Sequence, residues 1–149
     1  MTTNVESILN ELIETSKDGE SGFRKAAQDA CDPKLKSLFA ACATRCTDGA
    51  RELQQIVRTS GGDPERTGSV AAALHRGWIS VREAVTARDD QAILEECERG
   101  EDYAKAQYKK ALEHDLPMNV RVIVERQYQG VVANHDKVRA LRDAYRTPA

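Results

Sequence analysis

The stretch QAILEECERGEDYAKAQYKKALEHD, from Gln91 to Asp115, decides the fold of this chain. Its apolar and small residues recur at steps of three and four, which predicts an amphipathic helix. The inward seam of that helix comprises Leu94, Cys97, Glu101, Ala104, Tyr108 and Ala111. Glu101 is a carboxylate within this seam, and Glu98 lies beside it. Because an ionised carboxylate on a core face is unfavourable without a cation or a hydrogen-bond donor, other helices should bring partners to the same depth.

The composition favours long amphipathic helices in one domain. The chain has 149 residues, of which 31% are charged and 5% aromatic, a profile typical of helical proteins. The formal net charge of -2 argues against a dedicated nucleic-acid binder. No apolar run approaches the length of about 18 residues that crosses a bilayer, and the first residues lack the pattern of a secretory signal. We therefore expect a single cytoplasmic domain over residues 1–149, with neither nucleic acid nor membrane as a partner.

Turn signals divide the chain into four long helices and one shorter helix. Asp32 followed by Pro33 is typical of a helix start, and the Gly61-Gly62-Asp63-Pro64 run is typical of a helix end. A shorter helix is predicted from Val70 to about Arg88. The long helices are predicted at Val5 to about Ala30, Pro33 to the Gly61 break, Gln91 to Asp115, and about Met118 to Tyr145.

Two layouts of these helices are compatible with the sequence. In an up-down-up-down bundle, Val70 to Asp115 would form one very long third helix. In the other layout, Val70 to Arg88 is a crossover along the bundle, and the chain re-enters with its third long helix. The interruption at Asp89-Asp90 and the matched lengths of the four long helices favour the crossover. The sequence therefore predicts an all-α, ferritin-like four-helix bundle with an additional shorter helix at about 70–88.

The middle of the first helix is unusual for a core-facing stripe. Ser16, Gly19 and Glu20 stand where aliphatic residues would continue the seam. Glycine in a helix interior costs about 1 kcal/mol relative to alanine. Close packing or a ligand-filled space must therefore be accommodated at this level of the bundle.

Four polar side chains are predicted to lie near the middle of the bundle. Glu20 lies about 18 Å along the helix axis from the first interhelical turn. Glu101 and His135 lie about 23 and 27 Å from the turn at Pro117, and Glu98 lies opposite His135. Carboxylates and an imidazole from facing helices form a donor set suited to iron or manganese. The candidate metal ligands are therefore Glu20, Glu98, Glu101 and His135.

Each candidate also has an interpretation without a metal. Glu101 can pair with a lysine or arginine from another helix, and Glu20 can lie in a partly hydrated groove. His135 can be a hydrogen-bonded core histidine. A buried polar layer of this kind would fix the register of the helices in a protein that works by dimerising or by binding a partner. A non-enzymatic interaction module is therefore the alternative.

The cysteines are predicted to be reduced, as is usual in the cytosol. Cys42 and Cys46 lie four residues apart on one helix face and suit a disulfide poorly. We interpret them as small core residues. Redox sensing by Cys46 or Cys97 would require a reactive thiolate, which apolar burial disfavours.

Several motifs resemble an uncharacterised bacterial ferritin-like family. They are HRGW at 75–78, AILEECERGED at 92–102, DLP at 115–117, VERQ at 124–127 and HDKVRALRD at 135–143, together with LIETSKDGESGF and GGDPERTGS. The resemblance covers nearly the whole chain. Members of that family are named only as four-helix-bundle proteins with a domain of unknown function. The resemblance implies a ferritin-like bundle in a cytosolic, stress-related setting, and it implies no established activity.

Ferritin and rubrerythrin are more distantly similar, and this chain departs from their metal-binding pattern. That pattern has a Glu on helices one and three and a Glu-x-x-His on helices two and four. Glu20 and either Glu101 or Glu98 take the single-Glu places, and His135 takes the last histidine. Val132 stands where the partner Glu of His135 would be, and helix two has no histidine. The resemblance therefore implies iron or manganese in a degenerate di-metal site, a mononuclear site or a lost site, and we expect a homo-oligomer, such as a dimer.

Overall fold

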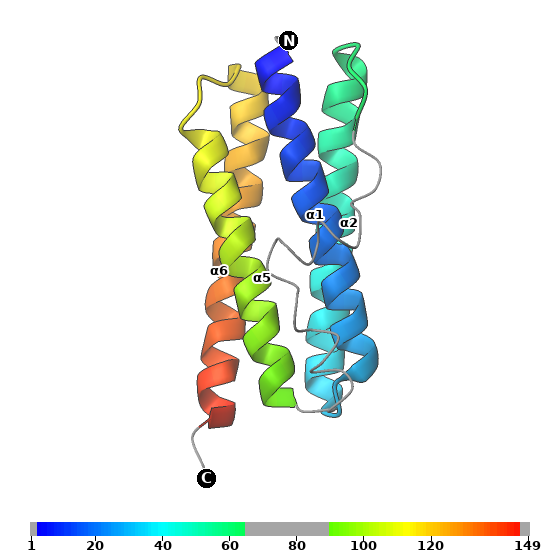
Figure 1. Ribbon diagram of the computed structural model, residues 1–149, viewed down its shortest axis with the longest axis vertical. Coiled ribbons are helices and arrows are strands. Elements are labelled where there is room, and N and C mark those ends of the chain that lie inside the picture. The colour runs from blue at the N-terminus through cyan, green and yellow to red at the C-terminus, as the bar shows by residue number, and fades with distance from the viewer. Residues whose placement is uncertain (1–2, 65–89, 147–149) are drawn as a thin grey trace.

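The computed structural model describes residues 3–64 and 90–146, and it is helical with short turns over those ranges. Four long helices lie side by side, as Figure 1 shows. No strand occurs within the described ranges, so the predicted all-α four-helix bundle is confirmed. The shorter helix predicted at about 70–88 lies outside the described residues. The helices are α1 (Thr3–Asp29), α2 (Pro33–Thr59), α5 (Asp90–Leu112) and α6 (Met118–Arg146).

Local capping interactions explain where α2 begins and ends. The Asp32 side chain accepts a hydrogen bond from the backbone N–H of Lys34 at 2.9 Å, and Pro33 occupies the first helical position. At the other end Gly61 has a φ of 83°, a conformation that glycine adopts without strain. The N–H groups of Gly61 and Gly62 close the last turn by donating to carbonyls of α2. The helix boundaries predicted from Asp32-Pro33 and Gly61-Gly62 are therefore confirmed.

The helices run in the order that the crossover layout predicts. Seen in Figure 1, α1 descends, α2 and α5 both ascend, and α6 descends. The residues after α2 lie beside the start of α1, where Glu6 accepts from the N–H of Asp63 at 2.8 Å. The first residue of α5, Asp90, lies at the opposite end, where its carboxylate accepts from the N–H groups of Cys31 and Asp32. Since α2 and α5 are parallel, the up-down-up-down layout is wrong.

The core consists of two apolar clusters separated by a polar layer. The cluster beside the α1–α2 turn contains the stacked rings of Phe23 and Phe39, whose centroids are 6.2 Å apart. The cluster at the other end contains Leu9, Leu53 and Val124. The buried polar residues between the two clusters include Thr15, Ser16, Asp18, Glu98, Glu101 and His135. The unusual middle of α1 therefore lies at the level of this polar layer.

No described helix has an apolar stretch long enough to span a bilayer.

Close packing between α1 and α2 gives a test of this layer. A Cβ atom placed on Gly19 would lie 2.8 Å from the Sγ atom of the buried Cys46. We expect Gly19→Ala to be tolerated better in a Cys46→Ala background, by about 1–3 kcal/mol in the free energy of unfolding, the usual cost of overpacking. A double-mutant cycle by urea denaturation measures this difference. Additive effects of the two substitutions would contradict the contact.

Candidate functional site

A cluster of two carboxylates and one imidazole lies between α5 and α6. Glu98 and Asp102 are four residues apart on α5 and therefore share one helix face, and His135 projects from α6. Each offers a ligand atom, and these three atoms all lie within 4.8 Å of one another. The side chains of Glu98 and His135 are buried, whereas that of Asp102 is 59% exposed. The cluster thus reaches from the interior to the surface.

Hydrogen bonds fix the orientation of the His135 ring. Its Nε2 atom contacts the Oδ1 atom of Asp102, and its Nδ1 atom lies 3.2 Å from the Oδ1 atom of Asp136. A carboxylate on one ring nitrogen fixes the tautomer that leaves the other nitrogen as a metal ligand. Asp136 can therefore hold the Nδ1 proton while Nε2 faces the carboxylates of α5.

Glu98 has cationic neighbours on α6. Arg142 donates from Nη1 to the Oε2 atom of Glu98, and Nε of Arg139 lies 4.0 Å from Oε1. Arg142 is itself only 17% exposed at its side chain. The two arginines neutralise the charge of Glu98 in the absence of any ion. The contact of Arg139 with Oε1 is the weaker of the two, because it is longer than a hydrogen bond.

Glu101 faces α2 and pairs with an arginine of that helix. The Nη2 atom of Arg45 donates to the Oε1 atom of Glu101 at 3.1 Å, while Glu101 is 2% exposed. Burial raises the pKa of Glu101, and the charge of Arg45 opposes that shift. Oε2 of Glu101 and Nε of Arg45 have no hydrogen-bond partner among the described residues. Glu101 is therefore paired with an arginine of another helix, as its interpretation without a metal predicts.

Glu20 lies apart from the cluster. Its carboxylate pairs within α1, with Arg24 at 3.1 Å and Lys17 at 3.6 Å. The structure thus brings together Glu98 and His135 from the predicted ligand set, and it places Glu20 and Glu101 outside the cluster that contains them. Asp102 completes the cluster and was not predicted. Its signal in the sequence was the four-residue spacing from Glu98, which places both acids on the same face of the helix.

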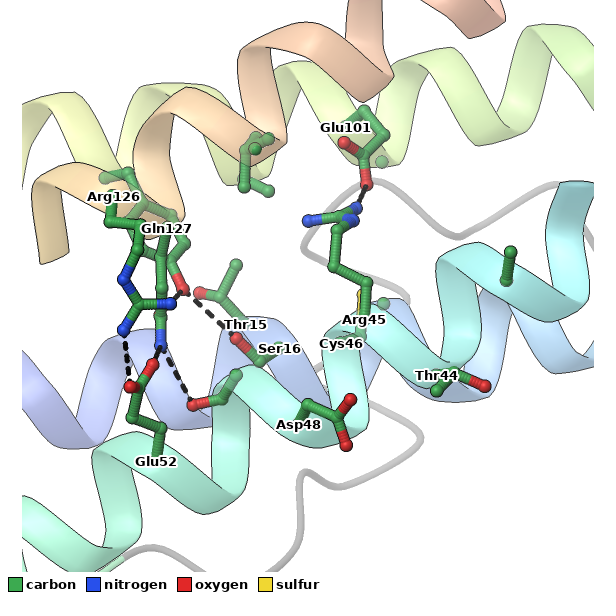
Figure 2. Close-up of a pocket in the computed structure, with 18 residues that line it drawn as sticks. Thr15, Ser16, Thr44, Arg45, Cys46, Asp48, Glu52, Glu101, Arg126 and Gln127 are labelled. Carbon is green, nitrogen blue, oxygen red and sulfur yellow. Dashed lines mark hydrogen bonds and ion pairs between the residues drawn. The ribbon is translucent and has the colours of Figure 1, made fainter. Parts of the chain in front are cut away.

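A cavity of about 620 Å³ lies at the same level, with all four helices contributing to its lining. Figure 2 shows Arg45 bonded to Glu101 on one side of it, and Glu52 joined by hydrogen bonds to Arg126 and Gln127 on the other side. One glycine of each helix lines this space, namely Gly19, Gly49, Gly100 and Gly130. The glycines leave room that larger side chains would fill. We call this space the Glu101 cavity.

The buried cysteines lie in an environment that suppresses reactivity. Burial raises the pKa of Cys42 to about 11 and that of Cys46 to about 12, and it raises the pKa of Cys97 well above its ordinary value. Because the thiolate is the reactive form, these three side chains suit packing better than redox sensing. Cys31, in contrast, is exposed at the α1–α2 turn.

The fold and the site define a four-helix bundle with a carboxylate and histidine cluster between its last two helices. The chain belongs to the family described as domain of unknown function (DUF2383), which matches residues 4–114. The match includes Glu98 and Asp102 and stops before α6, which carries His135. No curated protein was found to match the chain. The description of the family gives no activity.

Thiol labelling tests the burial of the cysteines. At pH 8 we expect one thiol per native chain, that of the exposed Cys31, to react rapidly with a chromogenic disulfide reagent. The thiols of Cys42, Cys46 and Cys97 should react only as the chain unfolds, because their raised pKa values leave little thiolate. A Cys31→Ser variant should show almost no fast phase. Rapid labelling of Cys46 or Cys97 in that variant would restore the redox-sensing hypothesis.

The Arg45–Glu101 pair gives a test by stability. Arg45→Met leaves a buried carboxylate without its cation and should destabilise the bundle by about 2–3 kcal/mol, less than for a fully buried pair because Arg45 is 32% exposed. The matched control is Arg126→Met, whose pair with Glu52 is more exposed on both sides and should cost about 1 kcal/mol or less. Chemical denaturation measures both. An equal loss of unfolding free energy in the two variants would show that Arg45 does not stabilise the buried charge of Glu101.

Proposed function

We propose that the cluster of Glu98, Asp102 and His135 binds one divalent transition-metal ion, with iron or manganese as the expected metal. The observation that carries the proposal is the convergence of two carboxylate oxygens and one imidazole nitrogen within 4.8 Å. Two carboxylates and one histidine are a donor set that suits these metals. Small side-chain adjustments would bring the three atoms to metal-ligand distances of about 2.0–2.2 Å.

The surroundings of the cluster support an ion with open coordination positions. Asp102 is 59% exposed at its side chain, so water can reach the ion from that side. Asp136 orients the imidazole from its other nitrogen. An ion with three protein ligands and solvent at its remaining positions can bind oxygen or peroxide. A role in iron handling or in oxidative stress is the setting that we propose for it, with a single ion in place of a di-metal centre.

Elemental analysis of protein purified without a chelator or an affinity metal tests the proposal. We expect about one iron or manganese per chain, and at least a tenfold weaker affinity in Asp102→Asn, because the variant loses one of three ligands. Asp102 is exposed, so this substitution should leave the fold intact, which circular dichroism checks. The matched control is Glu125→Gln, an exposed acid of α6 outside the cluster, which should retain the metal. Metal retained by Asp102→Asn, or absent from the wild-type protein after addition of Fe(II) or Mn(II), would overturn the proposal.

A second candidate is a non-enzymatic interaction module, and a surface feature favours it. Met118 and Val122 lie one turn apart on α6 and are 75% and 58% exposed, the largest exposures among the large apolar side chains of the described residues. Apolar side chains on one helix face are typical of a self-association surface. We propose that a homodimer forms through this face.

Sedimentation tests the homodimer. We expect the wild-type protein to be a dimer and the Met118→Glu, Val122→Glu double variant to be a monomer. A monomeric wild-type protein would exclude the homodimer.

A further inference from the structure

The Glu101 cavity contains a buried acid whose hydrogen bonding is incomplete. None of the proposed metal ligands lines this space. Glu101 contributes a carboxylate that is 2% exposed and bonded to Arg45 through one oxygen. Its second oxygen has no well-formed hydrogen bond among the residues described, and the side chain of Asn134 is close enough to lower the pKa of Glu101. When the geometry is favourable, a guanidinium often donates two parallel hydrogen bonds to a carboxylate. The single bond from Arg45 therefore satisfies Glu101 only in part.

The backbone keeps space open beside this acid. The cavity of about 620 Å³ is large enough for a small organic molecule. A Cβ atom on Gly49 would lie 3.7 Å from Gln127, and one on Gly130 would lie 4.0 Å from the Cδ atom of Arg45. Long side chains thus pass directly over two of the glycines. A larger residue at Gly130 would restrict the movement of Arg45, and a larger residue at either position would reduce the free volume of the cavity.

The charges around the cavity favour a cation. Its lining carries the acids Asp48, Glu52 and Glu101 and the bases Arg45 and Arg126. Arg126 is held by Glu52, and Arg45 by Glu101, so the excess charge is negative. The hydroxyls of Ser16 and Tyr108, which lie 3.4 Å apart, add further oxygen acceptors to the wall.

Arg45 has a second acid within reach on its own helix. Asp48 is exposed, lines the same cavity and follows Arg45 by three residues on α2. Residues three apart on a helix are neighbours that form ion pairs. When Arg45 turns away from Glu101, Asp48 can hold its guanidinium near the mouth of the cavity. The movement exchanges one carboxylate partner for another and leaves Glu101 open to the cavity.

We propose that the Glu101 cavity binds a small organic cation with a primary ammonium group, which replaces Arg45 as the partner of Glu101. The ammonium donates to the carboxylate of Glu101, and the aliphatic part of the ligand lies along Ala104 and Val131. In the absence of the ligand, the Arg45 side chain occupies the position of the ammonium beside Glu101. It neutralises Glu101 until the ammonium of the ligand displaces it, so Glu101 has a cationic partner in both states.

The probe for this site is 1,4-diaminobutane, measured by isothermal titration calorimetry on the full chain, with 1,4-butanediol as the uncharged control of equal length. We expect the diamine to bind and the diol not to bind. Glu101→Gln keeps the shape of the side chain and removes its charge, and it should weaken binding by at least about tenfold, which corresponds to 1.4 kcal/mol. Arg45→Ala should have the opposite effect and strengthen binding by about tenfold, because the internal competitor is gone.

A further variant keeps the proposal testable if Arg45→Ala does not fold. Gly130→Val retains both charges and narrows the cavity beside Arg45, so it should weaken the binding of the diamine and leave Asp102-dependent metal binding unchanged. Conversely, Asp102→Asn should leave diamine binding unchanged, which separates this site from the proposed metal site. Equal binding of diamine and diol, equal affinity in Glu101→Gln, or no diamine binding to the wild-type protein would overturn the proposal.

Discussion

The neutralisation of Glu101 is the constraint on which the middle of this bundle depends. A carboxylate that is 2% exposed requires a compensating cation, and Arg45 of α2 supplies it across the bundle. The two apolar clusters end on either side of this pair, and the glycines of all four helices lie around it. The bundle is therefore held together at its two ends by apolar packing, while its middle is organised by charge.

Three acids of α5, Glu98, Glu101 and Asp102, point from two different faces of the helix. Glu98 and Asp102 are four residues apart and point toward α6, where they meet His135. Glu101 is displaced around the helix axis from both, by about 60° and 100° at 100° per residue, and this displacement turns it toward α2. One short run of sequence, CERGED, thus supplies both the cluster between α5 and α6 and the acid of the cavity.

The sequence predicted the helices and the depth of the polar layer, because both depend on local rules. The capping residue Asp32, the glycines after α2 and the 3.6-residue period each act within a few residues. The depth of a residue along the helix axis was not enough to predict which side chains form the cluster of Glu98, Asp102 and His135. Glu20, Glu101 and His135 do lie at the level of the polar layer, yet they point to different neighbours, since a position along the axis does not determine the direction around it. Asp102 was missed because its exposed side chain excluded it from the apolar seam. The sequence allowed a lysine or arginine from another helix beside Glu101, but it did not identify Arg45, and it did not predict Arg142 beside Glu98, because long side chains reach acids on other helices.

Internal cations explain how a bundle with buried acids can fold before it binds anything. In small metal-dependent domains the ligands repel one another until the ion arrives, so folding and binding are a single event. Here Arg142 bonds to Glu98, Arg45 bonds to Glu101, and Asp102 and Asp136 flank His135. The charges of the buried Glu98 and Glu101 are compensated by the chain itself, so the free energy of folding does not have to come from a ligand. A cation that entered either of the proposed sites would compete with an arginine instead of filling a void. That competition would lower the affinity of the cation, so the occupancy of either site would follow the concentration of the free cation.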